Sequence, residues 1–357
     1  MIPLFDAHLD LAWSSLFWNR DLTASVDDVR ASEQQITDHR ARGRNTVTFP
    51  ELRKANVKVC LGTVLTRAKP EVNPVAGASR RDLDFRNQLI ASSIGHSHVR
   101  YYQELELAGE IRMIRTRTEL QDHWNQTNDS RVGLILAMEG ADPITAPDQA
   151  EHWWNLGLRS VGLSHYGQGP YGMGTGFEGP VTEKGFELLK EFQRLGMIVD
   201  LTHSAEPGFF QILDAFDGPV FASHNMVRAL TPGDRQFSDE QLKRLFERDA
   251  VIGMAFDAWM LFPGWKIHET DPSVVGLDAA ADHIDHICQL AGTTRHVGIG
   301  SDLDGGFGTE QTPRDLDTVA DLHKLNEILS KRGYSTQDIE GIFAGNFLRF
   351  FTNALPA

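Results

Sequence analysis

The chain begins with a short apolar run that carries a histidine and a carboxylate two residues apart, His8 and Asp10 in "FDAHLD". Side chains alternate across a β-strand, so residues at positions i and i+2 lie on the same face. His8 and Asp10 therefore point the same way from a segment that otherwise consists largely of core residues. Imidazole and carboxylate groups are both common metal ligands, so this pair is a candidate half of a metal site.

Five further apolar runs end in a histidine or a carboxylate. These end residues are Glu139 in "LAMEG", His165 in "GLSHY", His203 in "DLTHS", His224 in "ASHN" and Asp302 in "GIGSD". Taken singly, such a residue is more often a hydrogen-bonded structural group than a ligand. Together, so many buried imidazoles and carboxylates would each need a partner. A metal ion satisfies them collectively, so the set predicts a metal site.

The donor types and their number indicate which metal chemistry to expect. Nitrogen and oxygen donors without cysteine favour zinc, with manganese, iron or cobalt as alternatives. One catalytic zinc usually takes three protein ligands, so a larger set favours two metals bridged by a carboxylate and a hydroxide. No lysine ends these runs, so Glu139 is the expected bridging group. The candidate ligands are His8, Asp10, Glu139, His203 and His224.

Eight short β-rich runs must position these residues. They span residues 2–8, 57–64, 132–139, 159–165, 197–203, 219–225, 250–256 and 296–302, with helical patterns between most of them. Eight strands alternating with helices predict an α/β protein with a (β/α)₈ TIM barrel, whose active-site rim lies at the carboxyl ends of the strands. A doubly wound sheet is the competing fold, but no G-x-G-x-x-G follows the first run.

Two segments interrupt the alternation, and we expect both as insertions into one metal-dependent hydrolase domain spanning residues 1–357. A long polar stretch, 13–52, follows the first strand, and a glycine-rich stretch, 165–182, follows the fourth. Helices are expected over 183–196 and 238–249, among others. Gly196 is placed to end the first of these helices. Ser238 and Gln241 form a capping box at the start of the second.

Composition limits the partners. The chain has 357 residues, of which 41% are hydrophobic and 23% charged, and its net charge is −15. Nucleic acids and anionic membranes need a basic face, so we expect neither as a partner. The sequence shows no signal-peptide pattern and no apolar run of membrane-spanning length. Cys60 and Cys288 lie in apolar stretches, as buried reduced thiols do. We therefore expect a cytoplasmic protein.

At the residues singled out above, the chain resembles the membrane dipeptidase (renal dipeptidase) family, the M19 metallopeptidases of the amidohydrolase superfamily. The resemblance runs from "FDAHLD" through "MEG", "RLGMIVDLTHS", "SHN" and "GIGSDLDG" to "AGNFLR". It implies two Zn²⁺ ions per chain, one held by His8 and Asp10 and one by His203 and His224, with Glu139 bridging them. It further implies a dipeptidase that uses a metal-bridging hydroxide, and a homodimer as the candidate assembly.

The resemblance also implies roles for three residues beyond the ligands. Arg235, in "PGDRQF", would bind the carboxylate of the substrate, for which a planar guanidinium is well suited. His165 would contact the substrate and support the developing oxyanion. Asp302 would lie near the metals and transfer protons.

Two departures from the family pattern bear on the substrate. Ala7 and Leu9 stand where the family commonly has Gly and Asn, but Leu9 should point away from the metals. The loop "HYGQGPYGMGTGFEG" replaces an Asn-containing stretch, so dipeptide specificity is open. The leading hypothesis is hydrolysis of small dipeptides with a free carboxylate, L,D-dipeptides included. The alternative is an amidohydrolase acting on another carboxylate-bearing substrate, such as an N-acyl amino acid. A non-catalytic metal-binding barrel is disfavoured by the complete ligand set.

Overall fold

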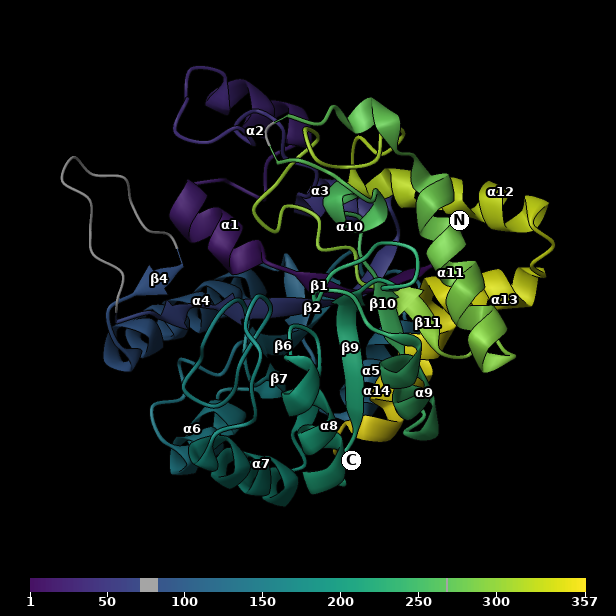
Figure 1. The fold of residues 1–357 in the computed structure, drawn as a ribbon. Coiled ribbons are helices and arrows are strands. Elements are labelled where there is room, and N and C mark those ends of the chain that lie inside the picture. Colours follow the sequence, from purple (N-terminus) through teal and green to yellow (C-terminus); the bar gives the residue numbers. More distant parts are fainter. Residues whose placement is uncertain (71–82, 268) are drawn as a thin grey trace.

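The structure is a computed structural model that describes residues 1–70, 83–267 and 269–357. Within these ranges, eight parallel strands form a closed barrel (Figure 1). Neighbouring strands pair in parallel around the ring, and pairing of β2 with β6 closes it. The predicted (β/α)₈ TIM barrel is confirmed. Its strands are β1 (Leu4–Leu9), β2 (Val57–Leu65), β6 (Val132–Glu139), β7 (Leu158–Gly162), β8 (Ile198–Asp200), β9 (Val220–Asn225), β10 (Ile252–Met254) and β11 (Val297–Ile299).

A further short strand, β5 (Ile111–Met113), was not predicted from the sequence. It pairs with the start of β6, where Ile111 lies opposite Val132. Along the same edge, β6 then pairs with β7 from Leu136 onward, while β2 occupies its other edge. Strand β5 therefore extends the sheet at the amino end of β6, away from Glu139.

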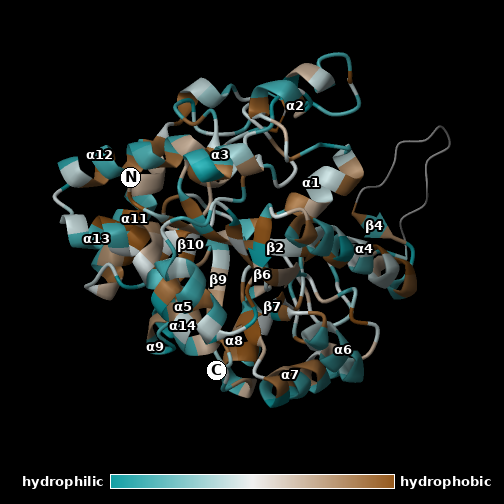
Figure 2. Ribbon diagram, turned by 180° about the vertical axis from the view of Figure 1, so that it is seen from behind, coloured by the Kyte–Doolittle hydropathy of each residue, from teal (hydrophilic) through white to brown (hydrophobic). Residues whose placement is uncertain are grey.

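The barrel strands are buried along their length because helices cover the outer face. Every residue of β1 and of β6 is buried, as is typical of parallel strands that are covered on both faces. Figure 2 shows hydrophobic strands at the centre and hydrophilic colour on much of the surrounding helices. The larger covering helices are α4 (Gln88–Leu107), α7 (Glu183–Leu195), α8 (Glu206–Ala215), α9 (Asp239–Glu247) and α11 (Leu277–Ala291).

The predicted helix ends agree with the structure. Helix α7 ends at Gly196, which takes the left-handed conformation (φ 78°) that glycine adopts readily. Helix α9 begins with the predicted capping box of Ser238 and Gln241. The remaining elements are β3 (Arg67–Ala68), β4 (Asp84–Phe85), α5 (Arg117–Asn125), η1 (Pro147–Gln149), α6 (Ala150–Asn155), α10 (Ala258–Leu261), η2 (Pro272–Val274), η3 (Val319–His323), α12 (Lys324–Lys331), α13 (Thr336–Glu340), η4 (Gly341–Gly345) and α14 (Asn346–Ala354).

The insertion after β1 is more structured than its polar sequence suggested. It contains α1 (Leu11–Trp18), α2 (Val26–Glu33) and α3 (Phe49–Lys54), and most of α1 is buried. Asp304 accepts hydrogen bonds from the backbone N–H groups of Thr46 and Val47, at 2.8 and 3.0 Å. The insertion is thereby tied to the loop that carries Asp302.

The glycine-rich segment 165–182 is a loop with isolated bridges and no helix or strand, as predicted. It folds tightly on itself. A Cβ atom on Gly174 would lie 1.7 Å from the carbonyl oxygen of His165, so only glycine fits there. This packing joins the loop directly to one of the site residues.

Two other expectations concern the thiols and the membrane. Both cysteines are free, with Cys60 buried and Cys288 half-buried. None of the helices in the described part of the chain combines the length and the apolar character needed to cross a bilayer.

Candidate metal centre

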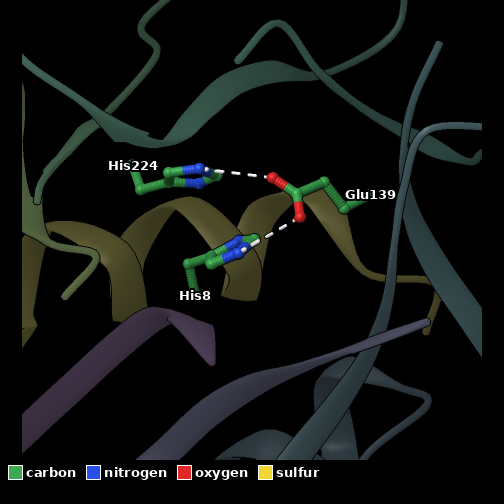
Figure 3. Close-up of side chains that lie close together, drawn as sticks. All are labelled: His8, Glu139 and His224. Carbon is green, nitrogen blue, oxygen red and sulfur yellow. Dashed lines mark ion pairs between the residues drawn. The ribbon is translucent and has the colours of Figure 1, made fainter. Parts of the chain in front are cut away.

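The histidines at the strand ends converge on the carboxylate of Glu139. Its Oε1 lies 3.1 Å from Nε2 of His203, 3.3 Å from Nε2 of His224 and 3.7 Å from Nε2 of His165. Its Oε2 lies 3.7 Å from Nε2 of His8, and Figure 3 shows His8 and His224 facing the two carboxylate oxygens. Glu139 thus lies between His8 on one side and His203 on the other, the position expected of a bridging group.

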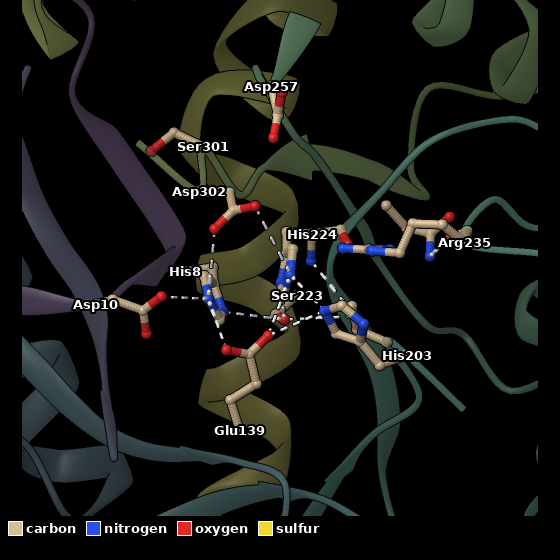
Figure 4. Close-up of polar contacts among 12 residues, drawn as sticks. His8, Asp10, Glu139, His203, Ser223, His224, Arg235, Asp257, Ser301 and Asp302 are labelled. Carbon is tan, nitrogen blue, oxygen red and sulfur yellow. Dashed lines mark hydrogen bonds and ion pairs between the residues drawn. The ribbon is translucent and has the colours of Figure 1, made fainter. Parts of the chain in front are cut away.

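Two aspartates complete the cluster on the side of His8. The Nε2 atom of His8 lies 3.7 Å from Oδ2 of Asp10 and 3.8 Å from Oδ1 of Asp302 (Figure 4). All five candidate ligands therefore lie together. His165 and Asp302 were expected to act on the substrate. Their side chains also lie close enough to the other donors to ligate a metal. In three sets, all ligand atoms lie within 4.8 Å of one another: His8, Glu139 and His224; Glu139, His165 and His203; and His8, Asp10 and Asp302.

The donor set fits bound metal ions because it is poorly satisfied without them. Among the described residues, Nε2 of His8 and Oε1 of Glu139 are buried without a hydrogen-bond partner. Nε2 of His203 lies only 3.3 Å from Nε2 of His224. Nearly all buried polar atoms in proteins have a partner, so convergence of unpartnered nitrogen and oxygen atoms on one point indicates a cation site.

Hydroxyl groups hold the other ring nitrogens of the histidines. Ser223 Oγ lies 2.9 Å from Nδ1 of His224 and 3.4 Å from Nδ1 of His8. Thr175 Oγ1, from the glycine-rich loop, lies 2.9 Å from Nδ1 of His203. Engaging Nδ1 orients each ring and leaves Nε2 directed at the cluster, as is usual for metal-binding histidines.

Several site residues share one position relative to their strands. His165, His203 and Asp302 each lie three residues beyond the last residue of β7, β8 and β11. His203 (φ 66°) and Asp302 (φ 58°) take the left-handed backbone conformation, which is rare outside glycine and clusters at functional sites. The chain therefore turns sharply as it leaves these strands and carries both side chains to the cluster.

Burial sets the protonation of the cluster. It raises the pKa of Glu139 well above its ordinary value, and it lowers the pKa values of His203 and His224 well below theirs. Burial also lowers the pKa of His8, but the charges of Glu139 and Asp10 outweigh it and raise that pKa to about 10. Burial raises the pKa of Asp302 to about 7. A bound cation would favour the ionised carboxylates and neutral imidazoles that ligate metals.

A cavity of about 180 Å³ lies over the cluster, and Arg235 lines it. The guanidinium is buried: Nη2 donates to the carbonyl oxygen of His224 at 2.9 Å, and the buried Nη1 has no hydrogen-bond partner among the described residues. Arg235 is therefore not a solvated loop residue. It can offer hydrogen bonds and a positive charge to an anion.

His165 has a defined proton position. Its Nδ1 lies 3.3 Å from Nη1 of Arg67, which is paired with Asp84 at 2.6 Å. A guanidinium only donates, so Nδ1 accepts and the ring carries its proton on Nε2. Burial and then the charge of Arg67 lower the pKa of His165 well below its ordinary value, so the ring is neutral. Its Nε2–H can donate a hydrogen bond into the cavity.

Two charged residues that line the cavity were missed in the sequence. Arg67 lies two residues after β2, and Asp257 lies three residues after β10. Both follow strands whose β-rich runs do not end in a histidine or a carboxylate. Asp257 directly follows the run 250–256, so a search extended by one residue would have found it. Arg67 comes after Thr66 and is neither a histidine nor a carboxylate, so the same rule would have missed it.

Comparison with known proteins identifies the family. Residues 1–355 match the profile of membrane dipeptidase (peptidase family M19). The chain belongs to this family. It is accordingly a metal-dependent peptide hydrolase of the M19 dipeptidases, and the resemblance inferred from its motifs is confirmed.

Individual proteins are similar to this chain in sequence or in fold. Dipeptidase aclJ of Aspergillus oryzae is 27% identical, and the alignment covers 98% of this chain and 77% of that protein. The uncharacterized dipeptidase C965.12 of Schizosaccharomyces pombe is 31% identical over 62% of this chain and 53% of its own length. The structure of dipeptidase AC, an M19 metallo peptidase, matches with a TM-score of 0.79 and 25% identity, covering 100% of this chain and 99% of its own. A Rhodobacter sphaeroides metallo peptidase, liganded with a phosphinate mimic of L-Ala-D-Ala, has a TM-score of 0.77 at 23% identity and 99% coverage of both chains.

Proposed function

We propose that residues 1–357 form one domain that acts as a binuclear zinc dipeptidase on small dipeptides, L,D-dipeptides among them. The observation that carries the proposal is the convergence of the ligand set on Glu139 under a small cavity lined by Arg235. His8 and Asp10 would hold one zinc ion, His203 and His224 the other, and Glu139 would bridge them. The L,D-dipeptides are included because a metallo peptidase of similar fold was crystallised with a mimic of L-Ala-D-Ala.

The chemistry divides between the metals and the chain. Bound zinc ions supply Lewis acidity and make a coordinated water acidic enough to act as a nucleophile near neutral pH. Arg235 would pair with the carboxylate of the substrate through the free Nη1. His165 would donate from Nε2 to the carbonyl oxygen as negative charge develops there. Asp302, at the edge of the cluster, would take a proton during attack and return it to the leaving amine.

The test is a hydrolysis assay on protein of known metal content, with a panel of L,L- and L,D-dipeptides. We expect turnover at about two zinc ions per chain, loss of turnover on chelation without unfolding, and loss in His203→Ala. If two metals bind but no dipeptide is turned over, the proposed metal site is supported and the proposed substrate class is wrong. A second variant, Arg235→Ala, should weaken turnover because it removes the cation expected to bind the substrate carboxylate. Its matched control is Arg244→Ala, which removes an arginine from an exposed ion pair with Asp214.

The same site admits a second substrate class, because Arg235 would recognise a carboxylate whether or not the substrate carries a free amine. An N-acyl amino acid is therefore the alternative. Arg235→Ala should weaken the turnover of either class and spare neutral substrates. A cytoplasmic location and a homodimer stay predictions from the sequence.

A further inference from the structure

Asp257 is a buried carboxylate in the wall of the metal-centre cavity with no part in the chemistry described so far. It is 6% exposed and lies three residues beyond β10, the same offset that places His165, His203 and Asp302. Figure 4 shows its carboxylate pointing toward the histidine cluster from the same side as Asp302. The fold therefore presents Asp257 to the cavity as it presents the other site residues.

Neutral donors hold this carboxylate in place. Nε2 of Gln311 donates to both carboxylate oxygens, at 2.8 and 2.9 Å, and the backbone N–H of Trp259 donates to Oδ1 at 3.2 Å. Oδ2 accepts from Gln311, and a carboxylate oxygen can accept more than one hydrogen bond. The orientation of Asp257 is therefore fixed before any ligand binds.

The carboxylate lacks a cation. Among the described residues Asp257 forms no ion pair, although Arg235 lines the same cavity. Burial, and then the charge of Asp302, raise the pKa of Asp257 to about 8, as expected of a buried acid with no cationic partner among the described residues. A buried carboxylate is costly unless it is paired, so a cationic group entering this cavity would gain a charge-assisted hydrogen bond.

The cavity is lined by both a cationic and an anionic side chain, which suits a zwitterionic ligand. A dipeptide carries a carboxylate at one end and an ammonium at the other, on either side of the bond that is cut. Arg235 offers a cation for the first group and Asp257 an anion for the second. The rings of Tyr166 and Trp259 also line the cavity, and aromatic faces attract ammonium groups. An N-acyl amino acid would leave Asp257 unpaired.

We propose that Asp257 binds a primary ammonium group of the substrate and thereby selects dipeptides over N-acyl amino acids. The inference rests on the proposed dipeptidase function and deepens it. The ammonium could come from the α-amine of the first residue or from a basic side chain. The small volume of the cavity, about 180 Å³, favours the α-amine.

The experiment uses the zinc-loaded protein and three related substrates. The first is the dipeptide that is turned over fastest. The second is its deamino analogue, in which hydrogen replaces the α-ammonium. The third is an Nα-acetylated lysyl dipeptide, whose only ammonium is on the side chain. The measured quantity is the preference, which is the ratio of kcat/KM for the dipeptide to kcat/KM for the deamino analogue.

We expect the wild-type preference to be on the order of 100-fold and to fall to within a few-fold in Asp257→Asn. Asp257→Glu retains the charge and should therefore keep part of the wild-type preference. Asp142→Asn is the matched control because Asp142 is buried and accepts the backbone N–H of Ala68, but does not line the cavity. It should leave the preference unchanged. If Asp257→Asn lowers only turnover of the lysyl substrate, the side-chain ammonium is the ligand.

Binding provides a second readout that does not depend on turnover. Calorimetry would compare a phosphinate dipeptide mimic with its deamino form on the wild type and on Asp257→Asn. We expect the affinity difference to disappear in the variant. A dipeptide preference that survives Asp257→Asn would overturn the role of Asp257 and leave the dipeptidase intact. If neither dipeptide nor mimic is recognised, the proposed function fails, and the role of Asp257 fails with it.

Discussion

The two ends of the barrel are built from the same strands. Near the amino end, Phe5 of β1 and Phe221 of β9 pack against Phe347 of α14, with ring centroids 5.7 and 6.2 Å apart. Three residues further along the same two strands, His8 and His224 lie at the carboxyl end with ring centroids 3.7 Å apart. One end is therefore filled by phenylalanine rings and the other by groups that bind ions.

The two ends should differ in what they contribute to stability. The amino end buries aromatic area, and this stabilises the fold. The carboxyl end buries carboxylates and imidazoles that lack partners, and this is unfavourable without a cation. The barrel can carry such a site because packing at its other end offsets the cost. Substitutions at the two ends should therefore separate stability from activity.

The largest effect is expected from Glu139→Gln at the carboxyl end. Loss of the central carboxylate should lower kcat/KM on the order of 10³-fold or more, because metal-dependent hydrolysis depends on the residues that hold the metal. The free energy of unfolding of the metal-free variant should equal or exceed that of the metal-free wild type, since burial disfavours the ionised carboxylate, raising its pKa well above the ordinary value, and Gln carries no charge. Urea unfolding of both proteins with chelator present measures this. A metal-free variant that is several kcal/mol less stable would mean that this end also stabilises the fold.

Phe347→Ala is the opposite test at the amino end. Removing a buried aromatic ring should lower the free energy of unfolding by about 3–5 kcal/mol. Metal content and the kcat of the remaining folded protein should stay near wild type, because Phe347 does not line the cavity. Denaturant unfolding and metal analysis check the two parts. Loss of bound metal from the folded variant would show that the two ends are coupled.

Arg67→Met tests, within the carboxyl end, whether activity depends on which ring nitrogen of His165 carries the proton. Without the guanidinium donor, His165 can carry its proton on either nitrogen, so kcat should fall about 100-fold while KM changes less. The ¹⁵N NMR shifts of the His165 ring report the tautomer directly. Arg131→Met, which breaks an ion pair with Asp129 far from the cavity, is the matched control. A wild-type His165 with no proton on Nε2 would contradict the assignment.

The sequence predicted the features that depend on local pattern. Alternation in β1 placed His8 and Asp10 on one face, and the caps of α7 and α9 were visible in Gly196 and Ser238. These signals are short in range and lie within a few residues of the element they define. The ligand set followed from a single topological rule, because parallel strands bring their carboxyl ends together.

Other features depend on tertiary contacts and have weak local signals. Strand β5 has three residues and forms only because β6 offers a free edge at its start. Helix α1 is buried nearly all round, so it lacks the amphipathic pattern by which surface helices are found. The pairing of Arg67 with His165 joins residues 98 positions apart. Such pairs become visible only when the barrel is closed.

The smallest effect concerns the pH dependence of stability, and it compares the two ends once more. Burial, and then Asp302, raise the pKa of Asp257 from 3.8 to about 8 in the folded protein. The stability linked to its proton is therefore fully present below pH 3.8 and is lost as the pH rises through the folded pKa. Asn cannot ionise, so the free energy of unfolding of metal-free Asp257→Asn, relative to that of the metal-free wild type, should rise by about 2.7 kcal/mol between about pH 5 and pH 7. Phe347→Ala should shift the curve by the same amount at every pH, since no charge is involved. Parallel curves for Asp257→Asn and wild type would mean that Asp257 is already compensated in the empty cavity, and the case for an ammonium ligand would weaken accordingly.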